Sequence, residues 1–114
     1  MAQRRVVIEG EIELDRPRRL DGAAAEVSLR EKGMADAPAK IVARGSVAPA
    51  PGSAGRIPFR LEATVEEEGD YALAAEIRLD GGAALAPGDL LTVAHHPWRC
   101  RGAAPVTLPV KEIL

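Results

Sequence analysis

Residues 5–14 read RVVIEGEIEL, and this stretch decides the fold class. Its large apolar residues fall on one parity and its glutamates on the other, which is the period of a strand with one buried and one solvated face. A helix would place glutamates one turn apart beside the isoleucines and mix the two faces. The stretch therefore predicts a half-buried strand with Ile8, Gly10, Ile12 and Leu14 facing inward and Glu9, Glu11 and Glu13 facing outward.

The same alternation recurs along the chain, between clusters of Pro, Gly and Asp that break strands. Short connections favour antiparallel pairing, because parallel neighbours need crossovers of about a dozen residues or more. The pattern predicts an all-β fold: a single antiparallel β-sandwich of seven to eight short strands with an immunoglobulin- or transthyretin-like architecture. Alanine-rich residues 21–26 and 83–85 also suit a helical turn, which would leave this architecture unchanged. The further strands are expected at 25–30, 41–47, 57–62, 71–80, 90–93 and 106–110.

Parity also predicts the core and the sheet edges. Pro58 and Pro109 fall inside predicted strands, and since proline cannot donate to a ladder, these strands are expected at edges. Gly10 on an inward face predicts a bulge or the close approach of another segment. The predicted core comprises Ile8, Ile12, Val27, Leu29, Phe59, Leu61, Tyr71, Leu73 and Ile77.

Size and charge narrow the classes of function. The 114 residues are expected to form one domain, residues 1–114, with 15 basic and 17 acidic side chains and a net charge of −2. That balance gives no broad basic field for nucleic acid. No stretch approaches the ~18 apolar residues of a membrane span. As the sequence stands, without a signal peptide or lipobox, a cytoplasmic location is expected, or the cell envelope if an upstream signal segment has been removed.

Residues 95–100 read HHPWRC and gather both histidines, the single Trp and the single Cys. Imidazole and thiolate suit zinc, so a metal-binding or catalytic site using His95 or His96 with Cys100 is one alternative. Adjacent residues of an extended strand point to opposite faces, however, and the spacing matches no zinc pattern. The favoured interpretation is a strand end with half-exposed histidines, a passive thiol, and Trp98 covering the rim of the core.

Signals for catalysis are weak elsewhere. Ser28, Ser46 and Ser53 do not lie in a nucleophile elbow. Asp80-Gly81-Gly82 and Gly88-Asp89 lack the ligand spacing of a calcium loop. The three outward glutamates predict a solvated face offset by basic side chains on the neighbouring strand. The acidic run at 66–70 is interpreted as a solvated turn, with attraction of a cation or basic partner as its alternative. We expect no enzyme, no catalytic residue, no metal and no cofactor.

Several short motifs occur in an order that resembles a known family. They are the 8–29 segment of two strands and a loop, MADAPA at 34–39 entering the strand at 41–43, IPFRL at 57–61, YALAAEI at 71–77 and VTLPV at 106–110. In this order the chain resembles the YbaY-like lipoproteins grouped with YscW, the type III secretion lipoprotein chaperone or pilotin. The resemblance covers residues 6–110.

The resemblance implies a small antiparallel β-sandwich with a noncatalytic role, in which some members bind and escort an outer-membrane secretin. It implies no catalytic or metal-binding residue. The family's aromatic-proline segment corresponds here to His96-Pro97-Trp98, so a binding surface at this place would differ in specificity.

Together these observations predict a noncatalytic protein- or peptide-binding module, pilotin-like or chaperone-like by resemblance. The expected partner is a protein or peptide, with a secretion-system component as the candidate that the resemblance supplies. Binding is expected beside Trp98, Pro97 and His96 or along a strand edge. A structural, self-associating domain is a further alternative, and a homodimer is the expected assembly if the chain self-associates.

Overall fold

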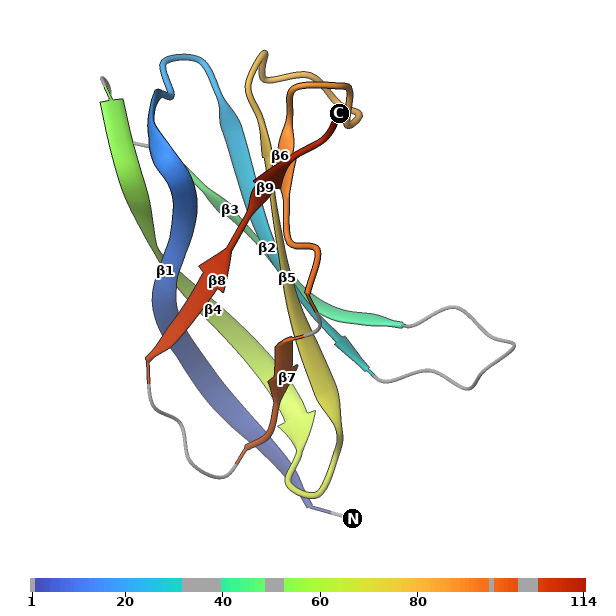
Figure 1. Ribbon diagram of the computed structural model, residues 1–114. Helices are drawn as coiled ribbons and strands as arrows, with labels where there is room; N and C mark the ends of the chain where they lie inside the picture. The colour runs from blue at the N-terminus through green and yellow to red at the C-terminus, as the bar shows by residue number, and fades with distance from the viewer. Residues whose placement is uncertain (1, 32–39, 49–52, 95, 101–104) are drawn as a thin grey trace.

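The computed structural model describes residues 2–31, 40–48, 53–94, 96–100 and 105–114. These residues form nine strands and no helix, and so no membrane-spanning helix is found among them (Figure 1). The strands are β1 (Gln3–Arg19), β2 (Ala24–Glu31), β3 (Ile41–Val47), β4 (Ser53–Glu66), β5 (Tyr71–Arg78), β6 (Leu90–Leu91), β7 (His96–Trp98), β8 (Val106–Pro109) and β9 (Lys111–Glu112).

The strands form two sheets, which confirms the predicted all-β sandwich. The first sheet has the order β4-β1-β8, and the second has the order β3-β2-β5-β6-β9. Strand β7 also belongs to the second sheet, because it pairs with the first residues of β5 while β6 pairs near its end. The long strands β1 and β4, of 17 and 14 residues, extend well beyond the short strands that the sequence predicts.

One pair of strands departs from the predicted antiparallel arrangement. Strand β8 lies parallel to β1, with Gly10 opposite Val106 and Glu13 opposite Pro109. The expectation of purely antiparallel pairing was wrong here because it considered only consecutive strands, whereas β1 and β8 are separated by most of the chain. At Gly10 the approach is close: a Cβ there would lie 2.1 Å from the carbonyl oxygen of Val106. The predicted close approach is therefore confirmed.

The two sides of the sandwich are closed differently. After β8 the chain crosses from the first sheet to the second, where β9 pairs with β6. The Val110 amide donates to the Glu13 carbonyl at 2.9 Å at this crossing. On the opposite side, the edge strands β3 and β4 lie next to one another, and their described residues form no ladder. Strands β4 and β8 lie at edges of the first sheet, which confirms the prediction from Pro58 and Pro109.

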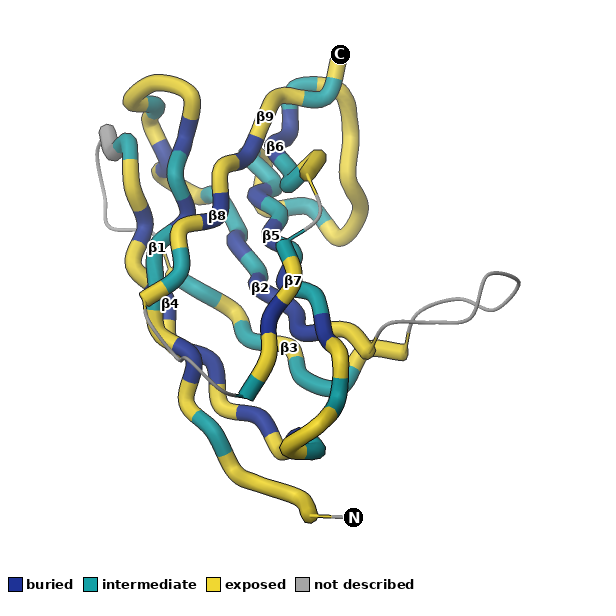
Figure 2. Tube along the Cα trace, turned by 60° about the horizontal axis from the view of Figure 1, so that its bottom comes forward, coloured by how far each residue is buried: buried dark blue, intermediate teal, exposed yellow. Residues whose placement is uncertain are grey.

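The core lies between the two sheets, and buried residues alternate with exposed ones along the strands (Figure 2). All nine residues that parity predicts to be in the core are buried. The outward face of β1 is solvated, as predicted: Arg56 pairs with Glu11 and Glu13, and Arg60 lies 4.0 Å from Glu9. The core also contains Leu14, Leu20, Ala25, Ile57, Ala63, Val65, Ala75, Leu90, Trp98, Leu108 and Val110.

Candidate functional site

The predicted cluster at residues 95–100 divides into buried and exposed parts. Strand β7 pairs with β5 and places Trp98 opposite Tyr71. The Trp98 side chain is buried, with its ring centroid 6.2 Å from that of Tyr71 and the two planes at 59°. Pro97 is exposed, and His96 and Cys100 are half-buried. The indole ring therefore packs within the core, and Pro97 presents the exposed surface of this strand.

The metal alternative receives no support from the part of the cluster that the structure describes. His95 lies outside the described residues. Among the described residues, no group of three or more His, Cys, Asp or Glu side chains could hold an ion. The Nε2 atom of His96 is buried, and it has no hydrogen-bond partner among the residues that the structure describes.

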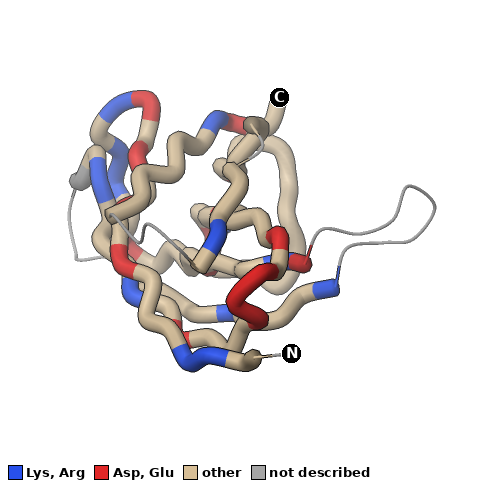
Figure 3. The backbone as a smooth tube through the Cα atoms, turned by 90° about the horizontal axis from the view of Figure 1, so that it is seen from below, with Lys and Arg blue, Asp and Glu red and all other residues tan. Residues whose placement is uncertain are grey.

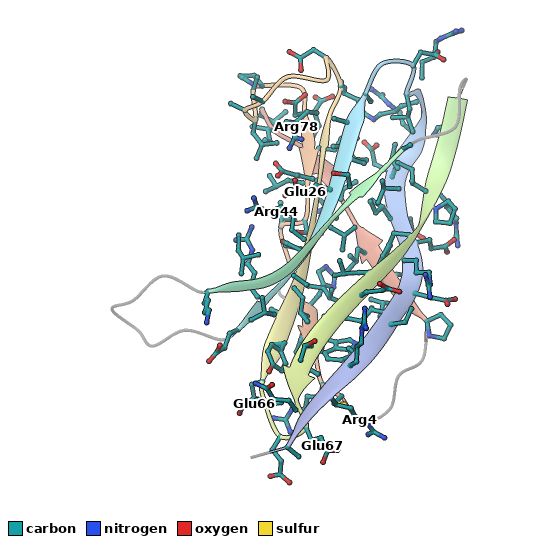
Figure 4. All side chains as sticks on the ribbon, turned by 180° about the vertical axis from the view of Figure 1, so that it is seen from behind. Arg4, Glu26, Arg44, Glu66, Glu67 and Arg78 are labelled. Carbon is teal, nitrogen blue, oxygen red and sulfur yellow. The ribbon has the colours of Figure 1, made fainter. Side chains whose placement is uncertain are left out.

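A groove opens between the edge strands of the two sheets, and we call it the edge groove. Its volume is about 680 Å³. Strands β3 and β4 approach each other near Gly45, where an added Cβ would lie 3.0 Å from Leu61 Cδ1. From there the strands diverge towards the start of β3 and the end of β4 (Figure 4). The groove is lined by Gln3, Glu31, Lys40, Ile41, Val42, Thr64, Val65, Glu66, Gly69, Asp70 and Tyr71.

Tyr71 links the sequence-predicted cluster to the edge groove. Its ring packs against Trp98, and its hydroxyl accepts a hydrogen bond of 2.8 Å from the backbone amide of Glu66. The turn between β4 and β5 contains Gly69, where an added Cβ atom would lie 2.6 Å from the ring of Tyr71. Trp98 therefore supports one wall of the groove from behind, although it does not line the groove itself.

The end of the molecule that carries the edge groove is acidic. The β4–β5 turn holds the run Glu66-Glu67-Glu68-Gly69-Asp70, and Figure 3 shows the acidic residues of this turn in red from below. Arg99 pairs with Asp70 at 2.7 Å, and Arg4 lies 4.0 Å from Glu67. Among the described residues, no ion pair or side-chain hydrogen bond engages the carboxylates of Glu31 and Glu66. Glu31 at the end of β2 and Glu66 at the end of β4 both line the groove, and because Asp70 is paired with Arg99 they leave it with an excess of negative charge over Lys40.

The outer face of the second sheet is also charged, but there the charges are paired. Glu26 and Glu76 lie directly opposite each other on β2 and β5. Arg44 pairs with Glu26 at 3.0 Å, and Arg78 pairs with Glu76 at 3.1 Å; Figure 4 labels Glu26, Arg44 and Arg78. Each of these two carboxylates therefore has its own arginine, unlike the carboxylates of Glu31 and Glu66 in the edge groove.

The serines and aspartates considered in the sequence have structural positions. Ser28 is buried, and its hydroxyl accepts a hydrogen bond of 3.3 Å from Arg30 Nε. Ser46 is exposed on β3, and the side chain of Ser53 lies outside the described part. Asp89 is buried, and its carboxylate accepts hydrogen bonds from two backbone amides, those of Leu79 and Ala86, each at 2.9 Å. The sequence did not indicate this loop-closing role of Asp89.

Comparison with known proteins identifies a relative by fold. No protein-family model matches the chain, and no curated protein matches it in sequence. Among solved structures, the chain is similar to an alternative pilotin from the type II secretion system of Vibrio cholerae. The TM-score is 0.71 at 21% sequence identity, over 96% of this chain and 99% of that chain. At this identity the likeness establishes the fold, and it confirms that the sandwich is pilotin-like.

Proposed function

We propose that the protein is a noncatalytic binding module with a pilotin-like role, in which it engages a segment of a secretion-system protein. The observation that carries the proposal is the likeness of fold to a type II secretion pilotin over nearly the full length of both chains. The order of motifs that resembles the YbaY-like and YscW lipoproteins supports the same role, and with it a location in the cell envelope.

The edge groove is the part of the structure best suited to bind such a segment. It combines about 680 Å³ of open space with apolar, charged and backbone groups from both sheets. A binding site of this kind needs no titratable catalytic pair, only complementary shape and a few placed polar groups. We propose that Trp98 and His96 do not contact the partner but hold Tyr71 and the start of β5 in place. The exposed Pro97 would contact the partner at the edge of the groove.

The experiment screens overlapping peptides from the secretin encoded in the same genome against the purified protein. Trp98 is the only tryptophan, and its contact with Tyr71 couples its emission to the wall of the groove. A binding peptide is therefore expected to shift the emission of Trp98, and calorimetry should give the same affinity. Trp98→Ala should weaken binding measured by calorimetry and keep the strand signal in circular dichroism.

A matched control is Leu85→Ala, which removes an exposed side chain from the β5–β6 loop, away from the groove lining. This variant should bind the peptide like the wild-type protein. If no secretin peptide changes the emission of Trp98 or releases heat, the proposed pilotin-like role is wrong.

A further inference from the structure

We propose that the bound segment is extended and joins the second sheet as an additional strand along the free edge of β3, with a basic side chain between Glu31 and Glu66. This inference rests on the proposed function and specifies the mode of binding and the chemistry of the partner. Three observations support it: β3 is an edge strand without proline whereas β4 and β8 each contain one, the edge groove widens towards the start of β3, and the groove is acidic.

Strand β3 is the long edge that is open to pairing. It pairs with β2 on one side, and among the described residues it has no ladder on the other. The other long edge, β4, contains Pro58, and β8 contains Pro109; each proline removes a backbone donor from its edge. Strand β3 spans Ile41–Val47 without proline, and its seven residues offer about 23 Å of backbone at ~3.3 Å per residue.

The shape of the edge groove provides room for one more strand. Near Gly45 the backbone of β3 lies close to Leu61 of the facing sheet, which narrows the space there. Towards Ile41 the two edges diverge and the groove opens. Ile41 is 38% exposed and Val42 is half-buried, so this end of β3 offers apolar contact to an added strand.

The charge of the edge groove determines which kind of peptide segment it can bind. Glu31 and Glu66 line the groove from strands of different sheets, and their carboxylates have no ion-pair partner within the described residues. The neighbouring hollow of about 230 Å³ is lined by Glu67, Glu68 and Arg99 and adds to the negative potential. A segment with Lys or Arg next to apolar residues would complement this surface, whereas an acidic segment would be repelled.

The first test uses the secretin peptide that binds in the screen and places N-methyl groups on its backbone amides one at a time. In an added strand, alternate amides point to the sheet, so methylation should weaken binding about three- to tenfold at every second position and little between them. Hydrogen exchange on the complex should show new protection in residues 41–47. Protection outside β3, or a methylation profile without this alternation, would overturn the added strand and leave the proposed function standing.

The second test addresses charge. Glu31→Gln and Glu66→Gln should each weaken the peptide severalfold, and the loss should shrink at high salt. Glu62→Gln is the matched control, because Glu62 lies on the same strand but does not line the groove and is paired with Arg5 and Arg60. Equal effects of all three variants on peptide affinity would show that the groove carboxylates do not recognise a basic side chain of the peptide. If no peptide binds at all, the proposed function fails together with this inference.

Discussion

The sharpest test of the packing concerns the parallel contact between β1 and β8. Gly10 faces the core, and a Cβ at this position would lie 2.1 Å from the carbonyl oxygen and 2.9 Å from the carbonyl carbon of Val106. Both atoms belong to a backbone held by pairing from Gly10 to Glu13. Gly10→Ala therefore forces β8 away from β1. The added methyl group would clash with backbone atoms of Val106, which cannot move aside as the end of a flexible side chain can.

The size of the effect follows from what β8 buries. Forcing a methyl group into a packed interior costs about 1–3 kcal/mol. Displacing β8 also loosens Leu108, which is fully buried, and loss of a buried leucine costs at most about 2–5 kcal/mol. The lower conformational freedom of alanine in the unfolded chain offsets less than about 1 kcal/mol. We expect Gly10→Ala to lower the free energy of unfolding by about 3 kcal/mol.

The assay is urea denaturation followed by Trp98 emission and far-ultraviolet circular dichroism. Gly45→Ala is the matched control, because its Cβ would meet only Leu61 Cδ1, at 3.0 Å, which is the end of a flexible side chain. We expect the control to change the free energy of unfolding by less than about 1 kcal/mol. If the two variants are equally stable, the close approach of β8 does not constrain Gly10 and the argument is refuted.

Substitutions at three other residues can be measured by the same denaturation assay. Phe59→Ala removes a buried ring and should cost about 3–5 kcal/mol; a cost below about 1 kcal/mol would place the ring at the surface. Asp89→Ala leaves two backbone amides without their acceptor and should cost about 2 kcal/mol, with Asp89→Asn costing less because it keeps one acceptor oxygen; a cost below about 0.5 kcal/mol for Asp89→Ala would show that the carboxylate is not needed. The hydrogen-bonded Arg18 holds the pKa of Asp15 below its ordinary value of 3.8. This pair therefore stabilises the fold above that value and loses its effect as the pH falls through the lowered pKa, so stability should decline less steeply with acid in Asp15→Asn than in the wild type.

Much of the sandwich could be predicted from local sequence because alternation fixes which side chains face inward. The run at 5–14 predicted both the buried face of β1 and its outward glutamates, whose arginine partners on β4 follow from that face. Pro58 and Pro109 predicted edge strands for the same local reason: a missing donor is tolerated only where no ladder bond is required.

What could not be predicted depends on contacts between distant segments. The parallel pairing of β8 with β1 is set by the path of the whole chain, which a period of two does not encode. The edge groove likewise combines residues from β1 to β5, and no single stretch of sequence indicates it. Trp98 drew attention as a rare residue, but only its contact with Tyr71 shows how it relates to the groove.

The open edge of β3 favours a different molecule over a second copy of this chain. Two β3 strands paired antiparallel about their centres would place Arg44 opposite Arg44, and like charges directly opposite are destabilising. A copy arriving in the parallel sense would bring its own Glu31 and acidic turn to the acidic end of the groove. Within the described residues, the crossing from β8 to β9 closes the far side and Pro58 interrupts β4, whereas β3 has no proline and no second neighbour; the charges near β3 disfavour self-association. We therefore expect the purified domain to remain monomeric in light scattering and to accept an extended basic segment along β3, and a stable dimer would contradict this argument.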